Sequence, residues 1–133
     1  MTRAQRHTNA DRVLRHLRQT GEPRSAYQIL AALRPEGFGA PMTVYRALEQ
    51  LEAAGRVHRI ESLNAWAACC RPAHSEAPVF LICQACGAVT ETLDHALANA
   101  LAALSARAGF TVEHTSVEIQ GRCAACIASA SAA

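Results

Sequence analysis

The feature that most constrains this chain is a matched pair of cysteine motifs, Cys83-x-x-Cys86 and Cys123-x-x-Cys126, with 36 residues between them. A C-x-x-C turn presents two sulfurs from one tight loop, and two such turns supply the four tetrahedral thiolates that suit Zn²⁺. Because four protein ligands leave no open position on the metal, the motifs predict a structural rather than a catalytic zinc site. The alternative is a set of redox-active dithiols or of buried thiols that bind nothing.

The compartment of the protein bears on that choice. No apolar run in the 133 residues approaches the ~20 residues that a membrane-spanning helix needs. The start, MTRAQRHTNADRVLRHLRQ, lacks the apolar stretch of a secretory signal. We therefore expect a cytoplasmic protein. Cytosolic thiols are kept reduced, so paired cysteines there are more often metal ligands or redox catalysts than structural disulfides.

Charge is distributed unevenly along the chain. Residues 1–62 carry ten arginines against six acids, whereas residues 63–133 carry three arginines against five acids, and the chain has no lysine. A basic half joined to a mildly acidic, cysteine-bearing half is typical of a nucleic-acid reader fused to a second module. The bias is small, and an ordinary solvated face explains it about as well.

The first half of the chain predicts three short helices followed by a β-hairpin. Helices are expected over residues 9–20, from an N-cap at Ser25 to Pro35, and from Pro41 to Gly55. In the segment RVHRIESLNAWAACC, apolar and polar residues then alternate imperfectly on either side of the turn residues SLN. This pattern predicts a β-hairpin. Together these elements predict a winged helix over residues 1–69. The expected buried stripes are Val13, Leu14 and Leu17, then Tyr27, Leu30 and Leu33, then Val44, Leu48 and Leu51.

The second half predicts a small domain over residues 79–133, after a linker at 70–78 that holds two prolines and has no periodicity. We expect a strand at 79–83, a turn, a strand at 88–92, a helix at 93–109, a strand at 110–119 and the second cysteine pair. The fold class is therefore α+β. One face of the helix is expected to carry Leu97, Leu101, Leu104 and Ala108, and the tail IASASAA is expected to fray.

Further residues of metal-ligand type fall on both sides of that linker. His58 and Cys69 lie on the two arms of the predicted hairpin, His74 lies in the linker, and Glu91 ends the strand after the first C-x-x-C. A metal ion bound by all four would fix the angle between the halves, as a metal-controlled switch requires. Spacing alone leaves each assignment open, because most histidines are ordinary residues and Cys69 and Cys70 also suit a role as small buried hydrophobic residues.

Three stretches of the chain resemble the ferric uptake regulator (Fur) family: TVYRALEQLEAAGRVHRIESLNAWAAC, FLICQACGAV and GFTVEHTSVEIQGRCAAC. The resemblance covers about residues 9–127 and is strongest to the zinc uptake regulator (Zur) branch. It implies a winged-helix DNA-binding domain, a C-terminal α/β dimerisation domain, and a structural zinc ion on the two C-x-x-C turns. It also implies a homodimeric, zinc-responsive repressor that binds palindromic operator DNA and represses zinc-uptake genes.

The family pattern also implies a regulatory zinc site. Its ligands match His58, Cys69, His74 and Glu91, so that each subunit would hold two zinc ions, one structural and one regulatory.

Two features of this chain depart from the family pattern. Many members carry a histidine-rich linker that builds a further metal site, whereas here the linker reads AHSEAP. That site is therefore not expected, and His95 and His114 are expected to be bystanders, with His114 as the alternative fourth ligand to His74. In addition, RHTNADR replaces the usual LTPQR before the first helix of the winged helix, which is expected to change a contact with the DNA backbone.

The segment APMTVYRALEQ is the expected recognition helix. With its apolar stripe buried, Thr43, Arg46 and Gln50 face outward, and residues near the start of such a helix enter the major groove. Arg46 can form a bidentate contact with guanine, and Tyr45 can touch a thymine methyl group. The family pattern gives Tyr27 a DNA-contacting role, although its place in an apolar stripe also suits the core.

The sequence suggests three alternative functions. The segment AHSE before the first C-x-x-C faintly resembles a zinc deaminase, but Ile82 stands where that signature has proline, and four thiolates leave no position for water. We therefore expect no enzyme. A sensor of iron, manganese or peroxide in the same family is disfavoured because a thiolate at Cys69 favours zinc over ions that prefer oxygen. The third rival is a dimeric scaffold in which zinc is only a structural clamp.

Overall fold

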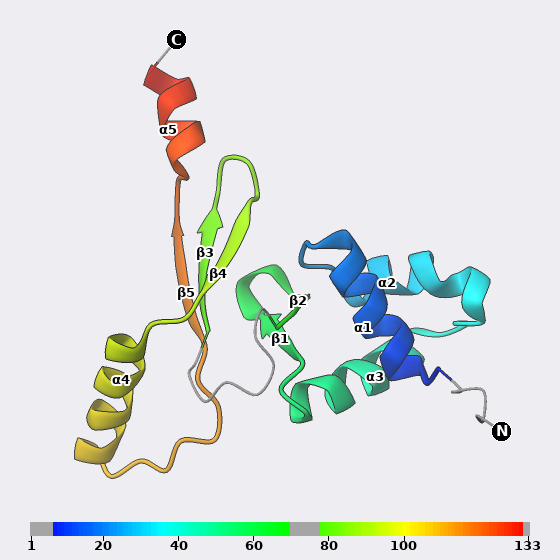
Figure 1. Ribbon diagram of the computed structural model, residues 1–133, viewed down its shortest axis with the longest axis horizontal. Helices are drawn as coiled ribbons and strands as arrows, with labels where there is room; N and C mark the ends of the chain where they lie inside the picture. Colours follow the sequence, from blue (N-terminus) through cyan, green and yellow to red (C-terminus); the bar gives the residue numbers. More distant parts are fainter. Residues whose placement is uncertain (1–6, 70–77, 132–133) are drawn as a thin grey trace, which may run out of the picture. The chain divides into compact units, whose positions relative to one another are not determined.

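The computed structural model describes residues 7–69 and 78–131. The chain forms two compact units, Met1–Ala73 and His74–Ala133, which we call the helical unit and the sheet unit. Figure 1 labels their elements. In the helical unit these are α1 (Asn9–Thr20), α2 (Ala26–Leu33), the 3-10 helix η1 (Arg34–Glu36), α3 (Pro41–Ala53), β1 (Val57–Ile60), the 3-10 helix η2 (Glu61–Leu63) and β2 (Ala65–Ala68); in the sheet unit they are β3 (Val79–Cys83), β4 (Val89–Thr92), α4 (His95–Arg107), β5 (Val117–Gly121) and α5 (Ala124–Ser131).

Local capping signals set the ends of the helices in the helical unit. Thr8 and Asp11 form a capping box at the start of α1, in which the Thr8 hydroxyl accepts from the Asp11 amide at 3.1 Å and the Asp11 carboxylate accepts from the Thr8 amide at 3.0 Å. Ser25 caps α2 in the same way, as the sequence predicts. The C-terminal end of α1 is capped by Gly21, whose φ of 65° lies in the left-handed region that favours glycine. The three helices are therefore confirmed close to their predicted bounds.

The core of the helical unit lies between its three helices and the hairpin. The predicted stripes of α1 and α3 are buried, but the stripe predicted for α2 is wrong at Tyr27, whose side chain is 66% exposed. The adjacent pair Ile29 and Leu30 centres the apolar face of α2 between them, so Ala26 rather than Tyr27 joins it one turn earlier. Residues that complete this core are Ala26, Ile29, Phe38, Ala47, Val57 and Trp66.

The predicted wing is an antiparallel hairpin. Strands β1 and β2 pair with Val57 opposite Ala68 and Ile60 opposite Ala65, and Asn64 adopts the left-handed conformation (φ 48°) at the turn. Arg24 and Trp66 exchange two backbone hydrogen bonds of 2.9 Å, which tie β2 to the segment before α2. The hairpin is thus fixed to the helices by backbone contacts as well as by the core, which completes a winged helix.

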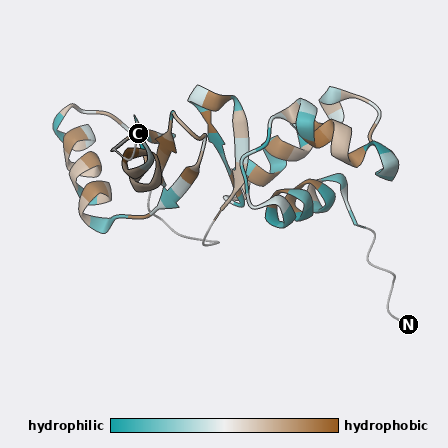
Figure 2. Ribbon diagram, turned by 90° about the horizontal axis from the view of Figure 1, so that it is seen from above, coloured by the Kyte–Doolittle hydropathy of each residue, from teal (hydrophilic) through white to brown (hydrophobic). Residues whose placement is uncertain are grey.

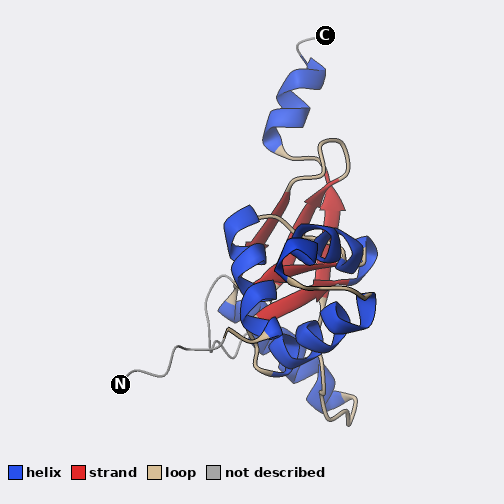
Figure 3. Cartoon of the chain, turned by 90° about the vertical axis from the view of Figure 1, so that its right-hand side faces the viewer, coloured by secondary structure: helices blue, strands red, loops and turns tan. Residues whose placement is uncertain are grey.

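The sheet unit is a three-stranded sheet in the order β4-β3-β5. Central β3 pairs antiparallel with β4 and parallel with β5, so that Phe80 lies opposite Glu91 on one side and Glu118 on the other. Figure 3 shows the strands of the sheet unit side by side, with α5 continuing from β5 past their ends. This arrangement brings the end of β3 next to the end of β5, where the two cysteine motifs lie.

Two predictions for the sheet unit are wrong. The strand expected over 110–119 begins only at Val117, and Phe110 before it is 75% exposed. Seven residues of that predicted strand therefore find no partner among the described strands. The tail expected to fray belongs to α5 over residues 127–131, and residues 132–133 lie outside the described residues. The first turn of α5 is closed by the Ile127 amide donating to the Cys123 carbonyl at 3.0 Å. Alanine, abundant in that segment, has the highest helix propensity.

The sheet unit leaves much apolar surface uncovered. Within the described residues, α4 contains no buried side chain, and Leu104 is 55% exposed. Figure 2 shows hydrophobic positions along α4 and the neighbouring strands. Other large exposed apolar side chains of this unit are Leu81, Phe110, Val112, Ile119 and Ile127. A single copy of the sheet unit therefore buries only a small core of its own.

Among residues 7–69 and 78–131, no helix combines the length and the apolar character needed to cross a bilayer.

Candidate metal centres and nucleic-acid interface

The four paired cysteines converge at one end of the sheet unit. Cys83 ends β3, and Cys86 follows in a turn closed by the Gly87 amide donating to the Cys83 carbonyl at 2.9 Å. Because β3 and β5 are parallel, with Cys83 opposite Gly121, the chain leaving β5 delivers Cys123 and Cys126 to the same place. The four sulfurs all lie within 4.8 Å of one another. Spacing in sequence and pairing of strands thus agree on one cluster.

The sulfur–sulfur distances fit a tetrahedral metal site. Cys83 and Cys126 are 3.7 Å apart, and Cys86 and Cys123 are 3.9 Å apart. A disulfide would need about 2.05 Å, which is far shorter. Four sulfurs placed about 2.3 Å from a central zinc ion at the corners of a tetrahedron would be about 3.8 Å apart. The cluster therefore has the size of a zinc–thiolate shell.

Hydrogen bonds within this cluster favour the thiolate form of one of its sulfurs. The Cys123 backbone amide donates to the Cys83 sulfur at 3.4 Å, and this bond is the main reason why the pKa of Cys83 falls to about 6. Hydrogen bonds with the side chains of Cys123 and Cys83 raise the pKa of Cys126 to about 12, because they stabilise its protonated form. Without a metal, neutral pH therefore favours a thiolate at Cys83 and a thiol at Cys126.

Zinc loading of the metal-free protein at pH 7 is expected to release at least one proton per ion, from Cys126. Zinc binds the thiolate, and Cys126 is protonated at pH 7 both in the folded sheet unit, where its pKa is about 12, and in an unfolded chain, where the pKa of a cysteine is about 8.5. This proton must therefore leave. Isothermal titration in buffers of different ionisation enthalpy measures this number directly. A binding enthalpy that is the same in every buffer would contradict the arrangement, and the Cys70→Ser protein serves as the matched control.

The register of the wing places His58 and Cys69 on one face of the hairpin. His58 lies opposite Ala67, and Cys69 follows Ala67 by two residues on the neighbouring arm. Cross-strand partners and residues two apart share a face, so His58 and Cys69 are diagonal neighbours. The Cys69 sulfur and a ring nitrogen of His58 lie within 4.8 Å, and both side chains are half-buried. One nitrogen and one sulfur donor are therefore together in the helical unit.

The other residues predicted for the regulatory site belong to other parts of the chain. Glu91 is half-buried on β4 of the sheet unit, opposite Phe80. His74, the predicted fourth ligand, lies outside the described residues, as does Cys70. In residues 7–69 and 78–131, His95 and His114 belong to no group of three potential metal ligands.

The predicted recognition helix, α3, presents an exposed stripe away from the core. At about 100° per residue, Met42, Arg46 and Glu49 lie opposite the buried side of the helix, and all three are exposed. Thr43 and Tyr45 lie on its two flanks and are half-buried. Pro41 at the first position starts the helix without a side-chain cap. Tyr27, the fourth residue predicted to contact DNA, is exposed near the start of α2.

An aromatic and cationic network that no sequence motif indicates lies between α3 and the wing. The Tyr45 ring meets the Trp66 ring edge-on, with centroids 5.9 Å apart and an interplanar angle of 75°. The Arg59 guanidinium carbon lies 5.5 Å from the centre of the Trp66 ring. Arg59 and Trp66 are direct cross-strand partners. Only the register of the hairpin could have revealed this contact.

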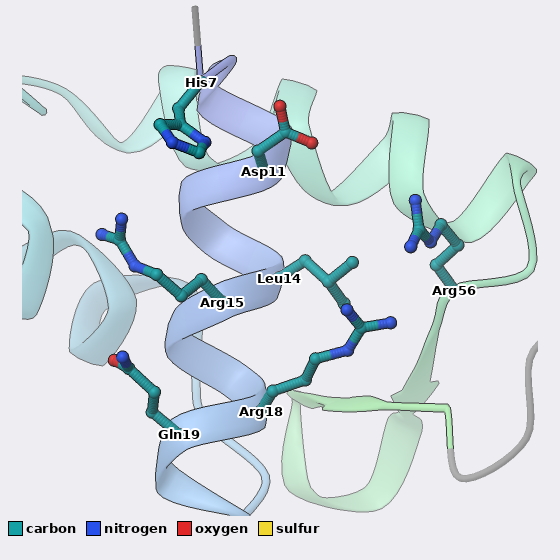
Figure 4. A pocket seen from close by; sticks show the side chains of 7 residues that line it. All are labelled: His7, Asp11, Leu14, Arg15, Arg18, Gln19 and Arg56. Atoms are coloured by element: carbon teal, nitrogen blue, oxygen red, sulfur yellow. The ribbon is translucent and has the colours of Figure 1, made fainter. Parts of the chain in front are cut away.

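A groove along the outer side of α1 adds further positive charge to the helical unit. Arg15 is already paired with the Glu36 carboxylate, whereas Arg18 extends from α1 on the side where Arg56 lies, after α3 (Figure 4). The residues that line the groove are His7, Asp11, Leu14, Arg15, Arg18, Gln19 and Arg56. Three of the ten arginines of residues 1–62 therefore line this groove, and one more, Arg46, lies on the recognition helix.

A winged helix joined to a small mixed sheet with a four-cysteine cluster defines a class of metal-binding proteins built around a DNA-reading fold. The chain matches the model of the ferric uptake regulator family over residues 1–120. It belongs to that family, as the sequence predicts.

Proteins similar to this chain include several that are named for the regulation of zinc uptake. The zinc uptake regulation proteins of Escherichia coli (strain K12) and Shigella flexneri are each 40% identical over 107 residues, which is 77% of this chain. The matched region spans 61% of the length of those two relatives. A solved zinc uptake regulator complexed with zinc and DNA is 34% identical with a TM-score of 0.84, covering 92% of this chain and 83% of its own. The holo form of XcZur is 39% identical with a TM-score of 0.82, covering 95% and 89%.

Proposed function

We propose that this protein is a zinc-responsive transcriptional repressor that binds palindromic operator DNA as a homodimer and represses zinc-uptake genes. The observation that carries the proposal is that His58 and Cys69, a nitrogen and a sulfur donor, lie together on the wing of a DNA-reading fold. Metal donors placed on the reading unit itself give a metal ion a direct way to control DNA binding. The named relatives support zinc as that metal and DNA as the partner.

The four-cysteine cluster is the proposed structural site. Cys83, Cys86, Cys123 and Cys126 would hold one zinc ion permanently, since four thiolates fill a tetrahedral shell and leave no position for exchange with water. The sulfur spacing of 3.7–3.9 Å supports this assignment. The ion would join the end of β3 to Cys123, which follows β5, and to Cys126 in the first turn of α5, and so close the sheet unit.

The regulatory site is proposed to hold a second zinc ion between His58, Cys69, His74 and Glu91. A thiolate and an imidazole together favour zinc over manganese and other ions that prefer oxygen ligands. Two of the donors belong to the helical unit and Glu91 belongs to the sheet unit. In this proposal the complete set would form only in some arrangements of the two units. The proposed domains are a reader over 1–69, a linker over 70–78, and a dimerisation domain over 79–133.

Operator reading is assigned to the exposed stripe of α3 and its flanks. Arg46 would form the bidentate contact with guanine, and Tyr45 would touch a thymine methyl group. Thr43 and the exposed Tyr27 would complete the contacts. The apolar side chains that the sheet unit leaves exposed support a two-fold dimer through that unit, and a two-fold dimer matches a palindromic operator.

Zinc would act by selecting one arrangement of the reading units. Without the regulatory ion, the two readers of a dimer sample many separations, and the apparent affinity for DNA falls by the fraction that matches the operator. With the ion bound, that fraction rises, so DNA binding follows free zinc. The roles of the two ions thus differ: one maintains the fold, and the other reports zinc availability.

The test is a DNA-binding curve over a range of buffered free zinc. Duplexes selected from a random library by the zinc-loaded protein serve as the probe, and fluorescence anisotropy reports binding. We expect one tightly held zinc ion per chain throughout, and DNA affinity that rises as a second ion binds. Affinity that does not change with free zinc would reduce the protein to a zinc-clamped scaffold, and failure to select any duplex would reject DNA reading itself.

A further inference from the structure

We propose that Arg59 on the wing binds a phosphate of the DNA backbone beside the groove that α3 enters, and that Asn64 and Trp66 hold its guanidinium ready for this contact. The inference rests on the proposed DNA-binding function and adds a residue that no motif in the sequence singles out. Its chemistry is that of a phosphodiester oxygen accepting hydrogen bonds from arginine.

Two contacts on the hairpin hold the Arg59 guanidinium. Its Nη2 donates to the Asn64 side-chain oxygen at 3.0 Å, and its carbon lies 5.5 Å from the centre of the Trp66 ring. Asn64 itself is held at the turn in the left-handed conformation, with φ of 48°. An arginine that is ordered before binding loses less conformational freedom when a ligand arrives, so a contact made through it is stronger.

The guanidinium keeps most of its binding capacity for a ligand. Arginine carries five N–H donors, and the hydrogen bond to Asn64 occupies one of them. The Arg59 side chain is exposed, and in the described part of the chain no carboxylate forms an ion pair with it. Arg15, by contrast, is paired with Glu36. Arg59 therefore offers an uncompensated, fixed cation at the surface of the reader.

The position of Arg59 suits the edge of the groove that α3 would occupy. The Arg59 guanidinium and the Tyr45 ring of α3 contact the same Trp66 indole, so one side chain links the guanidinium to the recognition helix. The major groove is about 12 Å wide, and an α-helix inside it has phosphates along both sides. A cation one side chain away from the helix therefore lies where those phosphates run.

The same hairpin separates this contact from the metal donors. Arg59 and Trp66 are cross-strand partners, whereas His58 and Cys69 are assigned by the register to the opposite face. Successive residues of a strand point to opposite sides, so His58 and Arg59 serve different faces of one wing. Changing Arg59 is therefore expected to leave zinc binding intact, which makes its role separable from the regulatory site.

The test compares Arg59→Gln, Asn64→Gly and the control Arg107→Gln in the full-length, zinc-loaded protein. Arg107 is an exposed arginine of α4, so its replacement changes net charge equally without touching the reader. Affinity for a library-selected duplex and for an unrelated duplex is measured from 50 to 300 mM salt. Zinc content and thermal melting are followed for each variant.

We expect Arg59→Gln to weaken binding to both duplexes by about tenfold near 0.1 M salt and to lower the slope of log K against log salt by about one, because one phosphate contact is lost. Asn64→Gly keeps the charge, and glycine accepts the left-handed turn, so affinity should fall by about two- to tenfold with an unchanged slope. Arg107→Gln should match the wild type.

Specific results would overturn the inference while leaving the proposed function in place. An unchanged salt slope in Arg59→Gln would show that the guanidinium touches no phosphate. An equal loss of affinity in Arg107→Gln would show that the effect comes from net charge alone. Loss of the second zinc ion in Arg59→Gln would show that the two faces of the wing do not act separately. If the wild type itself bound no duplex, the proposed function would be wrong, and the role of Arg59 would be rejected with it.

Discussion

Replacing Cys83 by serine is expected to unfold the sheet unit and to release one zinc ion per chain. A structural zinc site contributes about 10–16 kcal/mol of apparent binding free energy in small domains, which is comparable to the ~5–15 kcal/mol net stability of a whole domain. The sheet unit has little else to offset its loss, because α4 buries no side chain among the described residues. The described hydrophobic side chains that this unit buries all belong to β3: Val79, Phe80, Ile82 and Cys83.

The helical unit should survive the same change, because it has its own core of residues from α1, α2, α3 and the hairpin. Limited proteolysis with mass spectrometry should therefore cut residues 78–131 and spare residues 7–69, while metal analysis shows the lost ion. Cys70→Ser is the matched control and should keep both its zinc and its protection. A Cys83→Ser protein that kept one tightly bound zinc ion and a protected C-terminal half would contradict the assignment.

Much of the helical unit follows from sequence because its signals are local. Ser25 and Gln28 form a capping box within one turn, and the buried stripe of α3 repeats at the helical period. The cysteine cluster was equally predictable from the sequence, since each C-x-x-C turn is a local motif and one strand pairing brings the two turns together. The exposure of Tyr27 was harder to predict, because it depends on where the whole apolar face of α2 is centred.

The remaining features depend on pairings between distant residues. The contact of Arg59 with Trp66 requires the exact opposition of two strands, and its link to Tyr45 requires α3 to pack against the hairpin. A shift of one residue in register would move Arg59 to the face of the metal donors. The late start of the strand predicted over 110–119 has the same origin, because β5 extends only where β3 offers it a partner. Sequence periodicity carries no record of these oppositions.

Replacing Cys69 by serine is expected to abolish the zinc response of DNA binding while leaving the protein folded. The hydroxyl is a far weaker zinc ligand than a thiolate, so the regulatory ion is lost while the four-cysteine cluster is untouched. Coupling between an effector and a ligand is commonly worth 5–150-fold in affinity. Operator affinity at saturating zinc should therefore fall by about that factor, to the value of the metal-depleted wild type.

The measurement is the same anisotropy curve over buffered free zinc, with metal content determined in parallel. Cys69→Ser should hold one zinc ion per chain and bind DNA with a flat zinc dependence, and Cys70→Ser should behave as the wild type. Two tightly held ions in Cys69→Ser, or an unchanged zinc response, would remove Cys69 from the switch. Unfolding of the variant would instead assign it a structural role on the wing.

Reciprocity gives the same site a second and independent test. If zinc strengthens DNA binding by a given factor, then DNA must strengthen binding of the regulatory zinc ion by that same factor. Glu91→Gln removes a donor that lies on β4, outside the helical unit, so it should reduce both factors together while leaving the wing intact. Loss of only one of the two effects is thermodynamically inconsistent with a single shared equilibrium. It would mean that the ion bound by His58 and Cys69 is not the one that controls the reader.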